Sequence, residues 1–303
     1  MAAVSNTNHP SGAVSAPARG VNVGAAPVTY GQGDRAPRGD YARARADYTC
    51  EQPWSDYSEA DHDLYRRLYE RQAAQLPGLA CQEFIDAVQF LGAPTHIPRF
   101  EALSEELYKA TKWEVVAVPG LIPEEAFFSL LSQRKFPVTG WIRKPEEFAY
   151  VVEPDVFHDL FGHVPLLFNP MFADYMQAYG AGGLKASRLE SCEYLARLYW
   201  YTVEFGLIDT PEGLRAYGAG ILSSSTELRH SVMSPQPQRL GFDLERIMRT
   251  RYKIDSFQSS YFVVDSFRQL FEATAPDFTP VYQRVGRAGE LTAEERLASD
   301  RIF

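Results

Sequence analysis

The stretch EPDVFHDLFGHVP, residues 153–165, places His158 and His163 five positions apart among apolar side chains. Neighbours on one face of a continuous α-helix are three or four residues apart, so a spacing of five does not bring two side chains together. Pro154 is placed to begin a short helix, Gly162 can end it, and the proline at the end of the stretch prevents its resumption. We therefore expect His163 to fold back beside His158, so that two neutral imidazoles converge on one ion.

A third ligand has to come from elsewhere in the chain, and the candidate is Glu204. It lies in LARLYWYTVEFGL, residues 195–207, which is apolar or aromatic on nearly every side and is expected to be a buried helix. An uncompensated buried carboxylate costs several kcal/mol, and a metal ion is an economical partner for it. Two histidines and one carboxylate leave coordination positions open, which is the arrangement of non-haem iron(II) oxygenases.

Other interpretations of these residues stay open on chemistry alone. A histidine pair in an apolar stretch is often a hydrogen-bonded core feature, and a helix glutamate is usually solvated. Two histidines and a glutamate also ligate zinc in hydrolases, although the HExxH spacing typical of those enzymes is absent. The three residues by themselves therefore leave both the metal and its reaction undecided.

Composition and charge exclude several classes of protein. The chain has 303 residues, of which 45% are apolar, enough to fill a sizeable core. Its 30 basic and 39 acidic residues give a net charge of −9, and no cluster of five basic residues occurs, so we expect no nucleic-acid partner. No apolar run is long enough to span a membrane and no signal peptide is seen, which predicts a cytoplasmic protein with no membrane partner. The three cysteines, Cys50, Cys81 and Cys192, are expected to be reduced thiols.

The pattern along the chain predicts a mainly α fold with small β-sheets. Residues 1–45 are rich in Ala, Gly, Pro and Ser and are expected to form a disordered tail, followed by one folded domain at 46–303. Helices are expected after a cap at Ser58 and at 81–91, 104–111 and 123–132, and strands at 114–118, 148–152 and 261–264. Strands and helices do not alternate regularly, which argues against a doubly wound sheet.

Three motifs together carry a family resemblance. EPDVFHDLFGHVP is followed by YWYTVEFGL, residues 199–207, and by AYGAGILSSS, residues 216–225. In this order and at this spacing the sequence resembles the pterin-dependent aromatic amino acid hydroxylases, and among them the bacterial members that act on phenylalanine. The resemblance runs from about Asp47 through Ser266 and onward. It implies a single catalytic domain of that family's type.

The resemblance also implies the cofactors and their ligands. His158, His163 and Glu204 match the residues that bind Fe(II), and the second cofactor is a tetrahydropterin, either tetrahydrobiopterin or a bacterial analogue. A flat aromatic face suits a flat bicyclic ring, and Phe127 matches the side chain that stacks on it. The positions that match the remaining pterin contacts are Gly120, Leu121, Ile122, Asp159, Ala196 and Tyr199.

Residues around the substrate follow from the same resemblance. Arg143 matches the arginine that holds the substrate carboxylate, a task suited to a guanidinium fork. Trp200 and Phe205 match the walls of the ring pocket, and Ser223 matches a hydroxyl that supports a ligand histidine and the bound amino acid. Animal relatives carry a threonine where this chain has Val151, so no carboxylate contact beyond the arginine is implied.

Two positions bear on the choice of substrate. Tyrosine-hydroxylating relatives carry an aspartate at the position of Ile254, and tryptophan-hydroxylating relatives carry a phenylalanine at that of Trp200. Both favour L-phenylalanine, with dioxygen as co-substrate and L-tyrosine as product. Hydroxylation of tryptophan or tyrosine, a zinc hydrolase and a metal-free binding module are the alternatives. The end of the chain has no heptad pattern resembling the tetramerising helix of animal relatives, which predicts a monomer.

Overall fold

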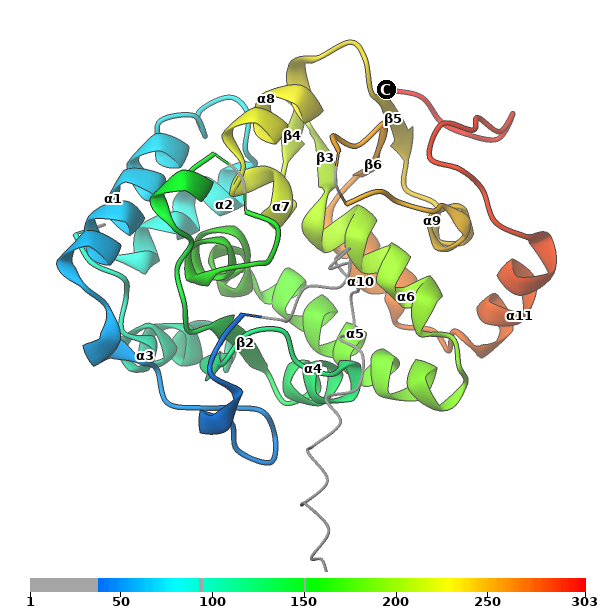
Figure 1. Ribbon diagram of the computed structural model, residues 1–303. Coiled ribbons are helices and arrows are strands. Elements are labelled where there is room, and N and C mark those ends of the chain that lie inside the picture. The colour runs from blue at the N-terminus through cyan, green and yellow to red at the C-terminus, as the bar shows by residue number, and fades with distance from the viewer. Residues whose placement is uncertain (1–37, 93–94, 150, 255) are drawn as a thin grey trace, which may run out of the picture.

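The computed structural model describes residues 38–92, 95–149, 151–254 and 256–303 (Figure 1). Helices form most of the regular structure, and two small sheets lie among them, so the predicted fold class is confirmed. The helices are α1 Glu59–Ala73, α2 Gln82–Val88, α3 Phe100–Thr111, α4 Glu124–Ser132, α5 Pro170–Arg188, α6 Cys192–Tyr199, α7 Ala219–Leu222, α8 Ser225–Met233, α9 Leu244–Arg249, α10 Phe267–Thr274 and α11 Thr279–Ala288. The strands are β1 Glu114–Val118, β2 Lys135–Thr139, β3 Gly206–Thr210, β4 Gly213–Ala216, β5 Gln238–Gly241 and β6 Ser260–Val264.

The predicted helices are present, with shifted ends. Ser58 caps α1 through a capping box, in which its hydroxyl accepts from the backbone of Asp61 and the Asp61 carboxylate accepts from the backbone of Ser58. The helix expected at 81–91 divides into α2 and a 3₁₀ turn at Gln89–Leu91. The helix expected at 104–111 already begins at Phe100.

Each sheet contains parallel strands. β1 and β2 pair in parallel, with Glu114 opposite Lys135, and α4 connects them as a crossover helix. The other sheet has the order β4-β3-β6-β5, with only the β3–β4 pair antiparallel. Strands were correctly expected at 114–118 and 261–264, and the others were not anticipated because they are short and β2 contains a proline.

The strand expected at 148–152 is wrong, because none of the described residues of this stretch belongs to a strand. No neighbouring strand pairs with it, and β-prone side chains alone do not make a strand. The Phe148 ring instead lies against the guanidinium groups of Arg67 and Arg71. Val151 and Val152 line a cavity described below.

The packing of α4 against α5 brings one wall of the site into place. A Cβ added at Gly183 on α5 would lie 2.1 Å from the Phe128 ring, and one at Gly180 would lie 2.5 Å from the backbone nitrogen of Ser132. Only glycine allows the two helices to approach this closely. In Figure 1, α1 and α2 lie on the left and α9 and α11 on the right, with α6 and α7 between them.

Most of the predicted tail, residues 1–45, lies outside the described residues. Residues 38–45 are described, and they include a 3₁₀ turn at Tyr41–Arg43. The three cysteines are free thiols, as expected. Among the described helices, none combines the length and the apolar character that a membrane crossing requires.

Candidate active site

A π-helical turn brings His158 and His163 together. In residues His158–His163 the backbone takes the wider π-helical form, in which hydrogen bonds join residues five apart. The spacing of five therefore places both imidazoles on one face, with their Nε2 atoms 3.2 Å apart. The expectation that Gly162 ends the helix is wrong, because the turn continues through His163. Gly162 instead allows α7 to pack closely against the turn, since a Cβ at this position would lie 2.9 Å from the Ala219 carbonyl oxygen.

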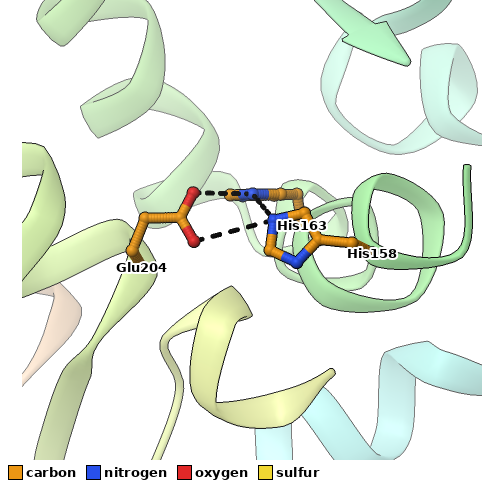
Figure 2. A group of neighbouring side chains, drawn as sticks. All are labelled: His158, His163 and Glu204. Atoms are coloured by element: carbon orange, nitrogen blue, oxygen red, sulfur yellow. Dashed lines mark hydrogen bonds and ion pairs between the residues drawn. The ribbon is translucent and has the colours of Figure 1, made fainter. Parts of the chain in front are cut away.

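Glu204 reaches the same point from a second π-helical turn, Trp200–Glu204, which continues α6. Its Oε1 lies 3.0 Å from His163 Nε2 and its Oε2 lies 3.7 Å from His158 Nε2. Figure 2 shows the carboxylate of Glu204 facing the two imidazole rings. The side chain is 2% exposed. The segment expected to be one buried helix, residues 195–207, thus consists of α6, this turn and the start of β3.

These three side chains, called the metal trio below, fit a single ion. One ligand atom from each lies within 4.8 Å of the others. With bonds of about 2.1 Å, ligands at right angles are about 3 Å apart, close to the observed separations. The two ring nitrogens and the carboxylate oxygens face one another at this range, so all three side chains could bind a cation placed between them.

The protonation of His158 suits metal binding. Burial lowers the pKa of His158 to about 4, so the ring is neutral at pH 7. A metal at Nε2 requires the proton on Nδ1, which lies 2.9 Å from Ser223 Oγ and can donate to it. The backbone nitrogen of His158 also donates to Asp155 Oδ1 at 3.0 Å. Ser223 therefore orients the ring, and Asp155 holds the backbone from which the ring extends.

A first cavity, called the Phe127 cavity, opens on one side of the metal trio. Besides the trio, its lining includes several residues expected to contact the pterin, namely Gly120, Leu121, Ile122, Phe127, Asp159 and Tyr199. Phe127 meets Tyr199 edge to face, with ring centres 5.8 Å apart. Ala196, which was also expected to contact the pterin, lies on α6 and is not among the residues that line the Phe127 cavity.

Asp159 is the acidic group of the Phe127 cavity outside the metal trio. It is buried, and its Oδ2 accepts a hydrogen bond of 2.7 Å from the backbone nitrogen of Thr139 on β2. Burial raises the pKa of Asp159 to about 7. Its carboxyl is therefore close to half protonated at neutral pH and can either accept or donate a hydrogen bond.

A second cavity, called the Trp200 cavity, opens on the other side and has a volume of about 590 Å³. Its lining contains all the residues expected to contact the substrate, namely Arg143, Trp200, Phe205, Ser223 and Ile254. The Trp200 ring stacks on Tyr252, with ring centres 4.3 Å apart, and contacts the tilted Phe205 ring, with ring centres 4.6 Å apart. His158 and Glu204 belong to the linings of both cavities, so the metal trio lies where they meet.

Arg143 is held by a buried ion pair. Its Nε and Nη2 donate to the two carboxylate oxygens of Asp155, each at 2.8 Å, and its backbone nitrogen donates to the same carboxylate. Burial alone raises the pKa of Asp155, but the charge of Arg143 and these hydrogen bonds outweigh it, so the pKa lies below its usual range. Asp155 therefore joins the arginine to the backbone of His158.

Sequence reasoning did not assign roles to some of the lining residues and their partners. Asp155 stands inside the quoted stretch 153–165, and its position three residues before a histidine is a signal that could have been used. Glu227 and Gln258 line the Trp200 cavity from separate segments, and their surroundings in the sequence are ordinary. Only the folded chain brings those two together.

The chain is similar to known proteins over most of its length. The family model described as biopterin-dependent aromatic amino acid hydroxylase matches residues 27–283. A phenylalanine-4-hydroxylase of Ralstonia nicotianae is 56% identical over 260 residues, which cover 86% of this chain and 83% of the relative. One from Chromobacterium violaceum is 57% identical over 258 residues, covering 85% and 87%. A crystal structure of the Chromobacterium violaceum phenylalanine hydroxylase bound to cobalt has a TM-score of 0.84 and 54% identity, and the match covers 86% of this chain and 95% of that one.

Proposed function

The chain belongs to the biopterin-dependent aromatic amino acid hydroxylases, and we propose that it converts L-phenylalanine to L-tyrosine with dioxygen and a tetrahydropterin at a non-haem iron(II) site. The observation that carries the proposal is the position of the metal trio between two cavities. An ion held by His158, His163 and Glu204 would be reached from both sides. A reaction in which a pterin, an amino acid and dioxygen all meet at one ion needs access to that ion from both cavities.

The metal trio and the Phe127 cavity would hold the two cofactors. When bound, iron(II) and the reduced pterin supply the site at which dioxygen is split and the electrons that this requires. His158, His163 and Glu204 would hold the ion through two ring nitrogens and one carboxylate, a ligand set that leaves coordination positions for other groups. Phe127 offers its ring face to the flat pterin, and Asp159 offers a carboxyl that can exchange hydrogen bonds with it.

The Trp200 cavity would hold the amino acid. Arg143 keeps Nη1 outside its pair with Asp155, and this nitrogen can bind the substrate carboxylate. Trp200, Phe205 and Ile254 form apolar walls that orient the ring toward the metal trio and exclude water from it. Ser223 supports His158 through the hydrogen bond to Nδ1.

The choice of phenylalanine over related rings rests on the same walls. Ile254 presents no polar partner to a phenolic hydroxyl, which disfavours tyrosine as the substrate. Apolar pockets separate similar rings by only about 1 to 3 kcal/mol per group, so side activity on tryptophan is expected at a lower rate.

The test is a product assay with purified protein, iron(II), a tetrahydropterin, dioxygen and each aromatic amino acid in turn. We expect tyrosine from phenylalanine, and no product from a Glu204→Ala variant because its iron is lost. Hydroxylated tryptophan as the main product would change the substrate. Stoichiometric zinc in the isolated protein, together with no hydroxylation after iron loading, would contradict the proposal and favour the hydrolase.

We also propose that the enzyme acts as a cytoplasmic monomer. The acidic net charge of −9 suits a dissolved protein that repels its own copies. Light scattering during size-exclusion chromatography should give a mass near the 34.1 kDa of one chain. A mass twice or four times as large would contradict the monomer.

A further inference from the structure

Gln258 connects two walls of the Trp200 cavity. It lies in the loop between α9 and β6, is 5% exposed and belongs to the cavity lining. Its Oε1 accepts a hydrogen bond of 2.9 Å from the indole nitrogen of Trp200. Its Nε2 donates to the carbonyl oxygens of Lys253 and Ser256, at 2.8 and 3.3 Å. These carbonyls stand on either side of Ile254 in the chain.

The backbone of Gln258 is itself anchored. Its nitrogen donates to Glu227 Oε1 at 3.3 Å, and the Tyr261 hydroxyl donates to the same oxygen. Glu227 is buried on α8, and its own backbone nitrogen donates to the capping hydroxyl of Ser224. These hydrogen bonds hold the backbone of Gln258 in place, and with it the side-chain amide that lines the cavity.

The hydrogen bond to Trp200 restricts a motion that stacking permits. Tyr252 stacks on the indole and Phe205 contacts it at a tilt, and these ring contacts chiefly restrain motion out of the indole plane. Stacked rings still slide and turn within that plane at little cost, since stacking depends weakly on in-plane angle. A directional bond at the indole nitrogen removes this freedom.

We propose that Gln258 is a positioning residue that sets ring selectivity, because its one amide holds the Trp200 indole and the Ile254 loop in a fixed relation. This inference rests on the proposed hydroxylase function. Both ends of the amide are needed, since the oxygen serves the indole and the nitrogen serves the loop. Glutamate has no donor for the loop carbonyls, and leucine has neither group.

Gln52 provides a matched control elsewhere in the molecule. Its Nε2 donates to the Pro98 carbonyl oxygen and its Oε1 accepts from the backbone nitrogen of Phe100, each at 2.9 Å. It is an amide clamp of the same kind, and it is not among the residues that line the Trp200 cavity. Loss of Gln52 should lower stability without changing selectivity.

The experiment compares wild type, Gln258→Leu, Gln258→Glu and Gln52→Leu with phenylalanine and tryptophan as substrates. The measurements are kcat and KM for each, and the hydroxylated product formed per tetrahydropterin oxidised. We expect both Gln258 variants to lose about three- to tenfold in kcat/KM for phenylalanine, the worth of one or two hydrogen bonds. The phenylalanine-to-tryptophan ratio of kcat/KM and the product yield per pterin should fall as well. Gln52→Leu should keep both at the wild-type value.

A second measurement separates this inference from the proposed function. In a Trp200→Phe background the ring has no N–H, so adding Gln258→Leu should change the ratio less than it does in wild type. Wild type without hydroxylated product would overturn the proposed function itself. An active wild type, with a folded Gln258→Glu or Gln258→Leu that keeps the wild-type ratio and product yield, would overturn only the role of Gln258.

Discussion

Arg143 pairs with Asp155 and also lines the Trp200 cavity, so its removal should have two separate effects. The guanidinium is buried and paired with Asp155, while it faces the Trp200 cavity. In Arg143→Ala we expect the KM for phenylalanine to rise by roughly 10- to 100-fold, the worth of a hydrogen bond to a charged group, with a smaller change in kcat. Steady-state kinetics at saturating pterin measures this.

The second effect is on stability. Asp155 would remain buried without its cation, which typically costs about 3 to 5 kcal/mol. The double variant Arg143→Ala with Asp155→Ala should recover part of that loss in urea unfolding but should not recover the KM. If KM returned together with stability, Arg143 would be a structural residue and not a substrate ligand.

Single residues differ in how far the sequence predicts them. The metal trio was predicted from its motifs, because ligand chemistry restricts the residue types at those positions, and the named contacts in the two cavities were implied by the family resemblance. Gln258 was not identified, since its role depends on a loop that packs against α6 from far along the chain. Ala196 was expected at the pterin and lies outside the cavity lining, because only part of α6 faces the Phe127 cavity.

At the scale of elements, the two π-helical turns explain both the success and the failure of the sequence prediction. Ordinary helix rules placed His158 and His163 apart, and a break at Gly162 was inferred to bring them together. The chain instead widens the helix, and this is the usual form of a π turn at a functional site. Local propensity does not reveal such a turn, because contacts with other elements, such as that of Gly162 with α7, select it.

A short segment before α1 lies against backbone that lines the Phe127 cavity. Residues 38–41, called the strap, contact the loop before α4 so closely that a Cβ on Gly120 would lie 2.3 Å from the Arg38 carbonyl oxygen. The Tyr41 hydroxyl donates to the Leu121 carbonyl oxygen at 2.9 Å. Gly39 has φ of +114°, and a Cβ there would lie 1.9 Å from the Pro119 carbonyl oxygen. The strap therefore supports the backbone that lines the Phe127 cavity.

Deleting the strap should weaken pterin binding. A chain beginning at residue 42 should bind a tetrahydropterin about tenfold more weakly than one beginning at residue 38, because the loop at 119–122 loses its support and becomes less preorganised. Calorimetric titration of the cobalt-loaded protein measures this without turnover. The chain beginning at residue 38 is the matched control. Equal affinities in the two chains would show that the strap does not shape the cavity.

The strap also forms an ion pair, between Arg38 and Glu147, whose contribution to stability should depend on pH. Arg38 donates to Glu147 at 2.8 Å through Nη1, and its hydrogen bonds lower the pKa of Glu147 from 4.5 to about 2. A lowered carboxyl pKa adds stability that is complete above pH 4.5 and is lost as the pH falls toward 2. The gap in unfolding free energy between wild type and Glu147→Gln should be constant from pH 7 to 5 and should shrink below pH 4.5.

Salt provides the control for this pair, because Arg38 is 39% exposed and its charge is partly screened. The gap at pH 7 should narrow in 1 M salt. A gap at pH 3 as large as the gap at pH 7 would mean that the Glu147 carboxylate is not stabilised through its charge.

The whole molecule was predicted in class but not in topology. Apolar periodicity predicted most of the helices in the first half of the chain, because the buried face of an amphipathic helix recurs as apolar residues every three or four positions. The four-stranded sheet was missed, because β3 and β6 are neighbours although 49 residues separate their ends, Thr210 and Ser260. Pairing over such a distance leaves no local pattern, and strands of four or five residues carry little signal of their own.

Metal binding should stabilise the whole domain, because the metal trio joins two segments about forty residues apart in the chain and only the folded state brings them together. At a metal concentration a hundred times the Kd, binding adds about 2.7 kcal/mol. For a domain of this size that corresponds to a rise in Tm of roughly 5 to 10 °C. Calorimetric melting of chelator-treated protein with and without Co²⁺, the ion in the structure of the Chromobacterium violaceum relative, measures it without oxidation chemistry. Mg²⁺, which prefers oxygen ligands, should give little rise, and Glu204→Ala should abolish the rise with Co²⁺. An equal rise in wild type and Glu204→Ala would place the metal somewhere other than at these three side chains.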